Sequence, residues 1–461
     1  MARSAAPENL AGGGVENGYS KLFPDLPPLS VGGAQLSWMG RPGGLCDLGV
    51  DATDGDDCRV DAVWPFFGQF VAHDITADRS PLDPARRSDE ITNFRTPRAD
   101  LECLYGPGPT GAAYMYEKDD PAKLLLASSG LDVPRNEEGV ALIGDARNDS
   151  HIFISQMHVA FAKLHNRLVD LLRHAGVEKT ELFELARRST TWHYQHIILR
   201  EFLPQVIGSS LASELVENGP GLFDVNHDGP RVPLEFAAAA YRYGHAQIRQ
   251  RYQVNAHFGP VPILPDLVGF GPVRPEHAVD WSLLIGSTAQ RAKRIDVRLA
   301  RALIELPPEV SGVHREDEYS SLAVRDLARG PIAGLASGEA IAREMGIAPL
   351  DAEAIGLASL GWRDETPLWL YVLREAEVLC GGERLGPVGG RIVGEVIVGI
   401  LDHDLQSFRS LEPDWQPSLA ENGSYSLADV LLPKQETSRN RTSGRPVRVA
   451  PEPGLNVHWP E

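Results

Sequence analysis

Two polar side chains stand one helical turn apart in an otherwise apolar segment, FFGQFVAHDIT (residues 66–76). Gln69 and His73 are four residues apart, so in a helix both side chains leave the same face. Polar groups on an apolar face need hydrogen bonds or a chemical role. A histidine there can exchange protons near neutral pH. Taken alone, the pattern is more often that of a hydrogen-bonded core histidine.

An arginine precedes a long amphipathic pattern in the segment GDARND (144–149). Arg147 lies just before this pattern, and by itself such an arginine is most often a surface or ion-pair residue. Helices usually begin at a short polar residue that accepts a backbone hydrogen bond. We therefore expect the helix to be capped by one of Asn148, Asp149 or Ser150.

A second histidine lies in AAYRYGHAQIRQRY (239–252). His245 follows Gly244, whose missing side chain would let a flat ligand approach the backbone closely. A core histidine is again the alternative. Two histidines and one arginine are nevertheless the minimum needed to hold a haem iron on one side and cleave a peroxide on the other.

In their order and in their residues, the three segments resemble the animal-type haem peroxidase superfamily. The resemblance is to a bacterial-type member and extends from about residue 60 to about residue 410. The resemblance implies that His73 is the distal acid–base and that Gln69 hydrogen-bonds distal water or a halide. It also implies that Arg147 stabilises the charge on the departing hydroxide. His245 would be the ligand of the haem iron.

The same resemblance assigns residues around the haem. Arg242 would pair with a haem propionate, as would Arg329 in SLAVRDLARGPIAGL (321–335). Asp326 stands where the family generally has an asparagine that accepts a hydrogen bond from the iron-ligating histidine. A carboxylate there would give the imidazole more anionic character.

Two departures from the family concern its covalent haem links. Many members have carboxylates that form esters with haem at the positions of Ala72 and Ser150. Neither residue is a carboxylate, so we expect non-covalent haem b unless Asp149 takes the role through a register shift.

The family also has a calcium loop. By resemblance, the side chains of Asp74, Thr96, Asp100 and Glu102 and the carbonyl of Arg98 would bind Ca²⁺, which prefers hard oxygen ligands. An acidic surface loop is the alternative. A competing EF-hand-like string, DVNHDGPRVPLE (224–235), is interrupted by prolines, so we expect Glu235 to open the following helix instead.

These residues imply a haem peroxidase that reduces hydrogen peroxide and oxidises a small organic donor or a halide through an oxoferryl intermediate. A fatty-acid oxygenase of the same superfamily is the alternative, but it needs a tyrosine at the position of Arg242. Tyr241 and Tyr243 flank this position and are expected to point elsewhere, because helical neighbours differ by about 100°. A non-catalytic haem- or calcium-binding module is a third possibility, which His73 and Arg147 disfavour.

The elements that must position these residues are mainly helical. The patterns predict one large α domain with long loops and little β structure over 46–433, an irregular arm over 1–45 and an irregular tail over 434–461. The main helices are expected over 61–75, 151–174, 180–202, 234–252, 367–380 and 388–401.

Composition limits the partners. The 461-residue chain has a net charge of −19, which argues against nucleic acid and anionic membranes as partners. Its best apolar run, 391–404, is too short to cross a bilayer. Four scattered cysteines and no apolar leader favour a cytoplasmic location, with non-classical export left open. The sequence leaves the oligomeric state open.

Overall fold

The protein is mainly helical, and the expected fold class is confirmed. Its single sheet consists of two antiparallel strands, β1 (Asp57–Asp61) and β2 (Arg291–Lys293). The computed structural model describes residues 18–49, 57–78, 82–83, 88–223, 230–314, 317–420 and 424–433. Within these residues, no helix combines the length and hydrophobicity needed to cross a membrane.

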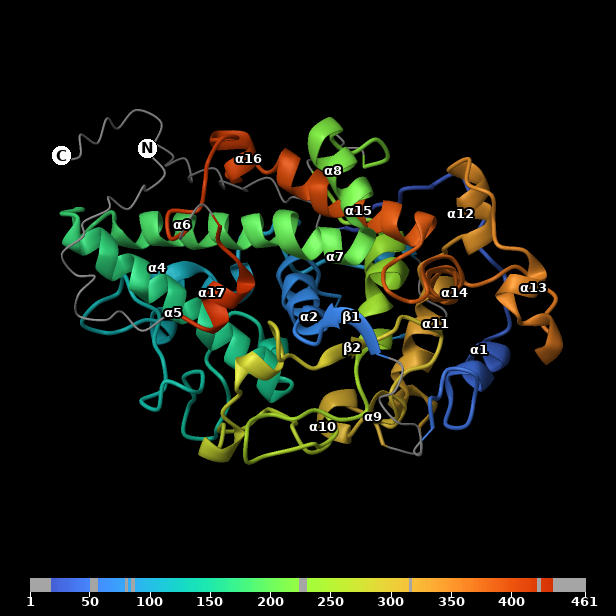
Figure 1. Cartoon of the computed structure of the whole chain (residues 1–461), viewed down its shortest axis with the longest axis horizontal. Helices are drawn as coiled ribbons and strands as arrows, with labels where there is room; N and C mark the ends of the chain where they lie inside the picture. Colours follow the sequence, from blue (N-terminus) through green and yellow to red (C-terminus); the bar gives the residue numbers. More distant parts are fainter. Residues whose placement is uncertain are drawn as a thin grey trace, which may run out of the picture.

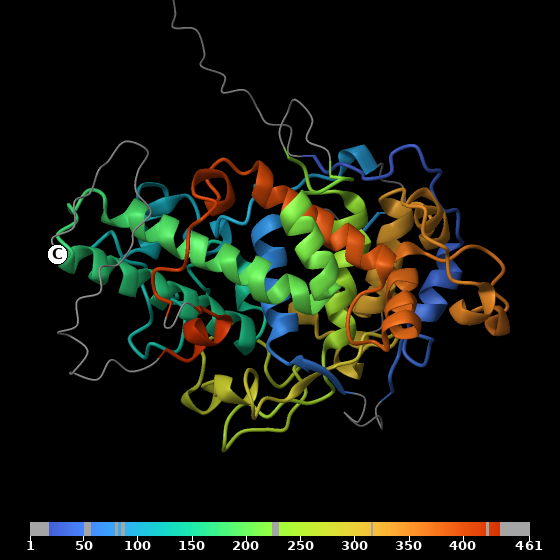
Figure 2. The same cartoon turned by 45° about the horizontal axis from the view of Figure 1, so that its top comes forward.

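Helix α2 (Trp64–Ile75) occupies the middle of the molecule in both Figure 1 and Figure 2. Pro65 lies in its first turn, where its missing N–H costs nothing. Asp61 ends strand β1 and Ala62 and Val63 form a turn, so the helix begins three residues after the expected start. Phe67 and Phe70 pack against Phe161 and Tyr194, with ring centroids 5.0–6.4 Å apart. Burying each such ring contributes about 1.5–3 kcal/mol, which anchors α2.

Two long helices pack against each other beside α2. Helix α5 (Ile152–His174) and helix α6 (Leu182–Ile197) run side by side in Figure 1. Helix α6 continues as a π-helical turn, Ile198–Phe202, so the expected helix over 180–202 is present in two parts.

Helices α14 (Leu368–Cys380) and α15 (Pro387–His403) match the last two expected helices. Glu375 of α14 is buried and accepts hydrogen bonds from the amides of Val388 and Gly389 in the first turn of α15, at 3.0–3.2 Å. Burial raises the pKa of Glu375 to about 7. The contact caps one helix with a side chain of the other.

The expected helix over 234–252 is wrong in pitch and in length. Its first part is a π-helical segment, Glu235–Ala239, and its second is a 3-10 helix, Ala240–Gln247. The backbone leaves helical geometry at Ala239, with φ −137° and ψ −78°, which separates the two parts. Tyr252 instead forms a bridge with Val261. Tertiary pairing therefore overrides the local helical pattern.

The expected irregular arm over 1–45 contains a helix, α1 (Gly33–Gly40). Leu36 and Met39 of α1 are buried, and the helix packs on α11 (Leu322–Ile332). The expectation of an irregular arm is thus wrong for these residues, because an apolar face meets a partner helix that local periodicity does not reveal. Residues 1–17 and the predicted tail over 434–461 lie outside the described residues.

The other helices are short. They are α3 (Glu102–Tyr105), α4 (Gly108–Gly111), α7 (Leu203–Ile207), α8 (Ser209–Asn218), α9 (Arg301–Ile304), α10 (Pro308–Ser311), α12 (Gly338–Glu344), α13 (Ala352–Ile355), α16 (Phe408–Leu411) and α17 (Leu427–Leu431). The short 3-10 turns are Ser88–Glu90, Ala113–Met115, Ala146–Asp149, Pro275–His277, Trp281–Leu283, Glu318–Ser320 and Ala358–Leu360. All four cysteines are free thiols.

Candidate active site

A cavity of 480 Å³ lies between α2, the Ala146–Asp149 turn and the 3-10 helix that contains His245. The structure brings five predicted site residues from these three segments together on its wall: Gln69, His73, Arg147, Arg242 and His245. These residues are up to 176 positions apart in the sequence. The packing of α2 against both other elements brings them together.

His73 lies near the end of α2 and is 8% exposed. Its Nδ1 lies 2.8 Å from the carbonyl Oδ1 of Asn148, so Nδ1 carries the proton and donates it. Nε2 is then the nitrogen with a free lone pair for the cavity. Burial, and next the charge of Arg147, lower the pKa of His73 to about 3. The imidazole is therefore neutral at neutral pH, as a general base must be.

Arg147 joins the end of α2 to Asp145. Its Nη2 donates to the carbonyls of His73 (3.0 Å) and Thr76 (2.7 Å), where a helix accepts positive charge. The guanidinium also bonds Asp145 at 2.7 Å and 3.0 Å. Burial alone would raise the pKa of Asp145, but Arg147, with help from Arg95, holds it well below its usual range. The arginine is thus fixed at the cavity wall rather than free to swing.

Gln69 meets a residue that the sequence analysis did not single out. Its Oε1 lies 2.8 Å from Nε2 of His151. His151 is the N-cap of α5 and accepts a hydrogen bond from the amide of Ile154. The expected caps Asn148, Asp149 and Ser150 are wrong, because the first two belong to the preceding 3-10 turn and Ser150 ends it.

His245, Asp326 and Arg242 form a hydrogen-bonded group on the opposite wall. Nδ1 of His245 donates to Oδ2 of Asp326 at 2.6 Å, which leaves Nε2 for the cavity. Arg242 donates to Oδ1 of the same carboxylate at 3.1 Å. Asp326 is buried on α11, and burial alone would raise its pKa. The partner groups His245, Arg242 and Arg329 instead hold that pKa below its ordinary value.

A smaller cavity of 230 Å³ adjoins the first and shares Arg147 and Arg242 with it. Arg329 and Tyr19 also line it. Arg329 donates to Asp78 at 3.2 Å, yet its buried Nε has no hydrogen-bond partner. Burial, and then the neighbouring Arg242, lower the pKa of Arg329 to about 10. Three arginines around one small cavity favour an anionic ligand group.

Residues 111–308 match the family model described as animal haem peroxidase. Chorion peroxidase of Drosophila melanogaster is 31% identical over 163 residues, which are 33% of this chain and 20% of the relative. Thyroid peroxidase of Canis lupus familiaris is 27% identical over 497 residues, covering 96% of this chain and 49% of the relative. Residues 111–308 therefore belong to the animal haem peroxidase superfamily. The whole chain spans less than half the length of these two relatives.

Solved structures show the same fold. Peroxidase A from Dictyostelium discoideum superposes with a TM-score of 0.65 at 15% identity, covering 90% of this chain and 92% of that one. Fatty acid alpha-dioxygenase of Oryza sativa gives a TM-score of 0.58 at 17% identity, with coverages of 77% and 71%. A solved peroxidase and a solved dioxygenase thus both have the fold of this chain.

Membership in this superfamily implies haem binding, and the two cavities fit the group. A Cβ at Gly244 would meet no atom within 4 Å, so the cavity is open beside His245. The hydroxyls of Ser150 and Tyr241 line the larger cavity as buried atoms without partners, and Arg329 has its unpartnered Nε in the smaller one. Haem has a flat apolar body and two carboxylates, which match an open slot beside an arginine-lined cavity.

The positions that carry ester-forming carboxylates in many relatives lie at the larger cavity. Ala72 and Ser150 line it, and neither can form an ester as a carboxylate does. Both carboxylate oxygens of Asp149 accept hydrogen bonds from Arg135 at 2.7 Å, and Asp149 is not among the cavity-lining residues. A register shift that would bring Asp149 to haem therefore has no support in the structure.

Asp74 and Asp100, two of the predicted calcium ligands, lie close to each other. Asp74 accepts hydrogen bonds from the amides of Leu101 (2.9 Å) and Cys103 (3.2 Å). Burial, and next the charge of Asp100, raise the pKa of Asp74 to about 8. The carboxylate is thus already tied to the backbone of the predicted calcium loop.

The rest of the predicted calcium loop is only partly assembled. The hydroxyl of Thr96 lies 3.4 Å from Asp100 Oδ2 and 3.3 Å from Glu102 Oε2. The side chain of Arg98 turns to Asp404, at 3.8 Å. Among the described residues, no three histidine, cysteine or acidic side chains converge on one metal position. Calcium therefore stays a prediction.

Glu235, the last residue of the EF-hand-like string, begins the π-helical segment. Its carboxylate accepts hydrogen bonds from the amides of Leu22 (3.0 Å) and Phe23 (3.1 Å). Glu235 therefore fastens the N-terminal arm over the proximal segment. Residues 224–229 of the string lie outside the described residues.

Tyr241 and Tyr243 flank Arg242, and both line the cavity. The segment is a 3-10 helix, in which neighbours differ by about 120°, so both tyrosines leave the helix in other directions than Arg242. Arg242 between them turns its guanidinium to Asp326.

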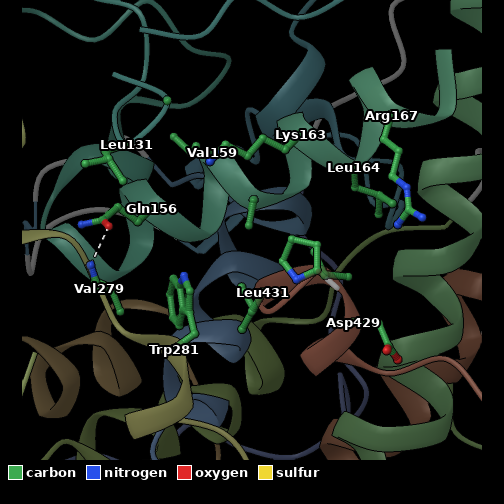
Figure 3. Close-up of a pocket in the computed structure, with 14 residues that line it drawn as sticks. Leu131, Gln156, Val159, Lys163, Leu164, Arg167, Val279, Trp281, Asp429 and Leu431 are labelled. Carbon is green, nitrogen blue, oxygen red and sulfur yellow. Dashed lines mark hydrogen bonds between the residues drawn. The ribbon is translucent and has the colours of Figure 1, made fainter. Parts of the chain in front are cut away.

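A separate cavity of 290 Å³ lies between α5, α17 and the segment around Trp281 (Figure 3). Its walls are mainly apolar and include Leu131, Val159 and Leu431. Gln156 holds one side by accepting a hydrogen bond from the amide of Val279 at 2.9 Å. The described residues that line it include no histidine, whereas His73 and His245 both line the 480 Å³ cavity.

Sequence reasoning missed Asn148, His151 and Tyr19. Asn148 lies within GDARND, directly after Arg147, so the motif itself could have pointed to it. His151 follows three residues after Asn148, next to the positions where an N-cap was expected. No local signal marks Tyr19, which reaches the smaller cavity from the N-terminal arm.

Proposed function

We propose that the protein is a haem peroxidase that reduces hydrogen peroxide and oxidises a small organic donor or a halide. The supporting observation is a neutral, buried His73 that shares one cavity with a His245 bonded to a carboxylate. We further propose that the haem is b-type and non-covalent, since Ala72 and Ser150 replace the ester-forming residues.

When bound, haem supplies the redox centre that takes up two oxidising equivalents from peroxide. His245 would hold its iron through Nε2, because Nδ1 is committed to Asp326. Arg242 and Arg329 would meet the propionates in the smaller cavity.

His73 moves the proton. Its free Nε2 accepts the proton of the nearer peroxide oxygen and then passes it to the other oxygen, which departs as water. Asn148 keeps the required tautomer throughout, because its carbonyl holds the Nδ1 proton. Arg147 stabilises negative charge that develops on the departing oxygen, and Asp145 keeps its guanidinium in place.

The test is an absorbance spectrum of the haem-loaded protein before and after one equivalent of hydrogen peroxide. His73→Ala should keep haem yet react with peroxide about 10²–10⁴-fold more slowly, the usual scale for lost acid–base catalysis. His245→Ala should lose haem or change the resting spectrum. His165→Gln is the control, since His165 is buried outside the cavity, bonded to Tyr105 and to the carbonyl of Ala122. Equal peroxide reactivity of His73→Ala and the wild type would refute the proposal.

Fatty-acid oxygenation is a second candidate because of one observation. The phenol of Tyr241 borders the cavity and its buried hydroxyl has no hydrogen-bond partner. If this tyrosine serves an oxygenase, Tyr241→Phe should abolish oxygen uptake with a fatty acid. Peroxidase activity towards a phenolic donor should survive the same change.

A further inference from the structure

His151 links the start of α5 to the predicted distal glutamine. It is 6% exposed, and each of its ring nitrogens has one partner. Nδ1 accepts a hydrogen bond from the backbone amide of Ile154 at 3.4 Å, and Nε2 lies 2.8 Å from Oε1 of Gln69. His151 and Gln69 line the 480 Å³ cavity together.

The helix cap determines the tautomer of this histidine. A backbone N–H can only donate, so Nδ1 of His151 must be the accepting nitrogen and the single proton must be on Nε2. Nε2 therefore donates, and Gln69 must offer its carbonyl oxygen rather than its amide nitrogen. Burial lowers the pKa of His151 to about 3, so this neutral form persists at neutral pH.

The ring of His151 is held in place by its surroundings. It packs against Phe66 and Phe153, with ring centroids at 5.4 Å and 6.2 Å. The next residue on the chain, Ile152, donates its amide to the carbonyl of Leu267 at 3.1 Å. Two stacked phenylalanine rings on one side and the backbone hydrogen bond of Ile152 hold the imidazole, and a held ring imposes one orientation on the amide it contacts.

We propose that His151 is a positioning residue that turns the amide NH₂ group of Gln69 towards the cavity as a fixed hydrogen-bond donor. Gln69 would thereby bind small anions, such as a halide or the hydroperoxide anion, through its N–H groups. The inference rests on the proposed haem function for its ligand, but the tautomer and the amide orientation stand without it.

Three variants distinguish the effect of His151 on the orientation of Gln69 from its effect as the N-cap of α5. His151→Ser keeps a good N-cap but cannot reach Gln69, whereas His151→Ala loses both contacts. Gln69→Ala removes the donor itself. Fluoride affinity of the ferric haem protein, read from its absorbance, should fall about tenfold in all three, the scale of a lost hydrogen bond to a charged group. Only His151→Ala should also lower the melting temperature through the cap.

The double variant His151→Ser/Gln69→Ala should bind fluoride no more weakly than Gln69→Ala alone, because His151 acts through Gln69. Wild-type fluoride affinity in His151→Ser, or losses that multiply in the double variant, would overturn the proposal.

A second measurement does not depend on haem. Two-bond ¹H–¹⁵N spectra of the full chain with labelled histidine should show His151 protonated at Nε2, in both the wild type and Gln69→Ala. If the proton is found on Nδ1, the orientation argument falls even in a working peroxidase. If the Nε2 proton is found but no haem binds, the positioning of Gln69 stands and the proposed function fails.

Discussion

Replacing Asp326 by asparagine should weaken the fold and change the haem site together. The carboxylate accepts hydrogen bonds from His245 and Arg242, and the charge of buried Arg329 acts on it as well. Asparagine keeps the size but removes the charge and turns an NH₂ group towards one of the two donors. Removing one member of a buried charged group costs about 3–5 kcal/mol, because the remaining charges lose their counter-charge. We expect Asp326→Asn to lose about 3 kcal/mol of unfolding free energy.

The same change should raise the reduction potential of the haem iron. Hydrogen bonds to charged groups contribute about 1.5–3 kcal/mol, and the 2.6 Å contact makes His245 more anionic, which favours the oxidised iron. Since about 1.4 kcal/mol corresponds to about 59 mV for one electron, the rise should be on the order of 60–130 mV. The potential can be measured by spectroelectrochemical titration and the stability by urea unfolding.

Asp296→Asn is the matched control. Asp296 is equally buried and bonds Lys293 at 2.7 Å, but it is not among the residues that line either haem cavity. It should therefore lose stability without any shift in potential. The reasoning would be refuted if Asp326→Asn unfolds like the wild type, or if both variants shift the potential equally.

Three further predictions concern ionisation, calcium and haem attachment. The pKa of Glu375, raised from 4.5 to about 7, means that the folded state binds its proton more tightly than the unfolded chain. The contribution of this carboxyl to stability is then fully present below pH 4.5 and is lost, by about 3 kcal/mol in all, as the pH rises through 7; Glu375→Gln should remove this dependence in urea unfolding, and an unchanged slope would contradict it. If calcium binds the predicted loop, Asp100→Ala should lower the melting temperature and peroxide turnover together. Added calcium should raise both quantities only in the wild type, and an increase in the variant would exclude this site. Acid–organic extraction should release unmodified haem b because Ala72 and Ser150 cannot form esters, and haem that stays with the polypeptide would disprove this.

The amino-acid sequence by itself determined the helical class and the parts of the site that depend on local order. The four-residue spacing of Gln69 and His73 places both side chains on one face of α2, whatever α2 packs against. Strong amphipathic periodicity likewise located α5, α14 and α15 to within a residue or two. These features arise from neighbours along the chain, so a single sequence contains them.

Only the tertiary structure decided which polar groups meet. The bond between His73 and Asn148 spans 75 residues and the bond between Gln69 and His151 spans 82. The proximal segment adopts π- and 3-10 geometry rather than the expected α-helix, and Tyr241 lines the cavity. The physical reason is common to these cases. A buried polar group takes whatever partner the packed core presents, and the energy of satisfying it exceeds local helical preference.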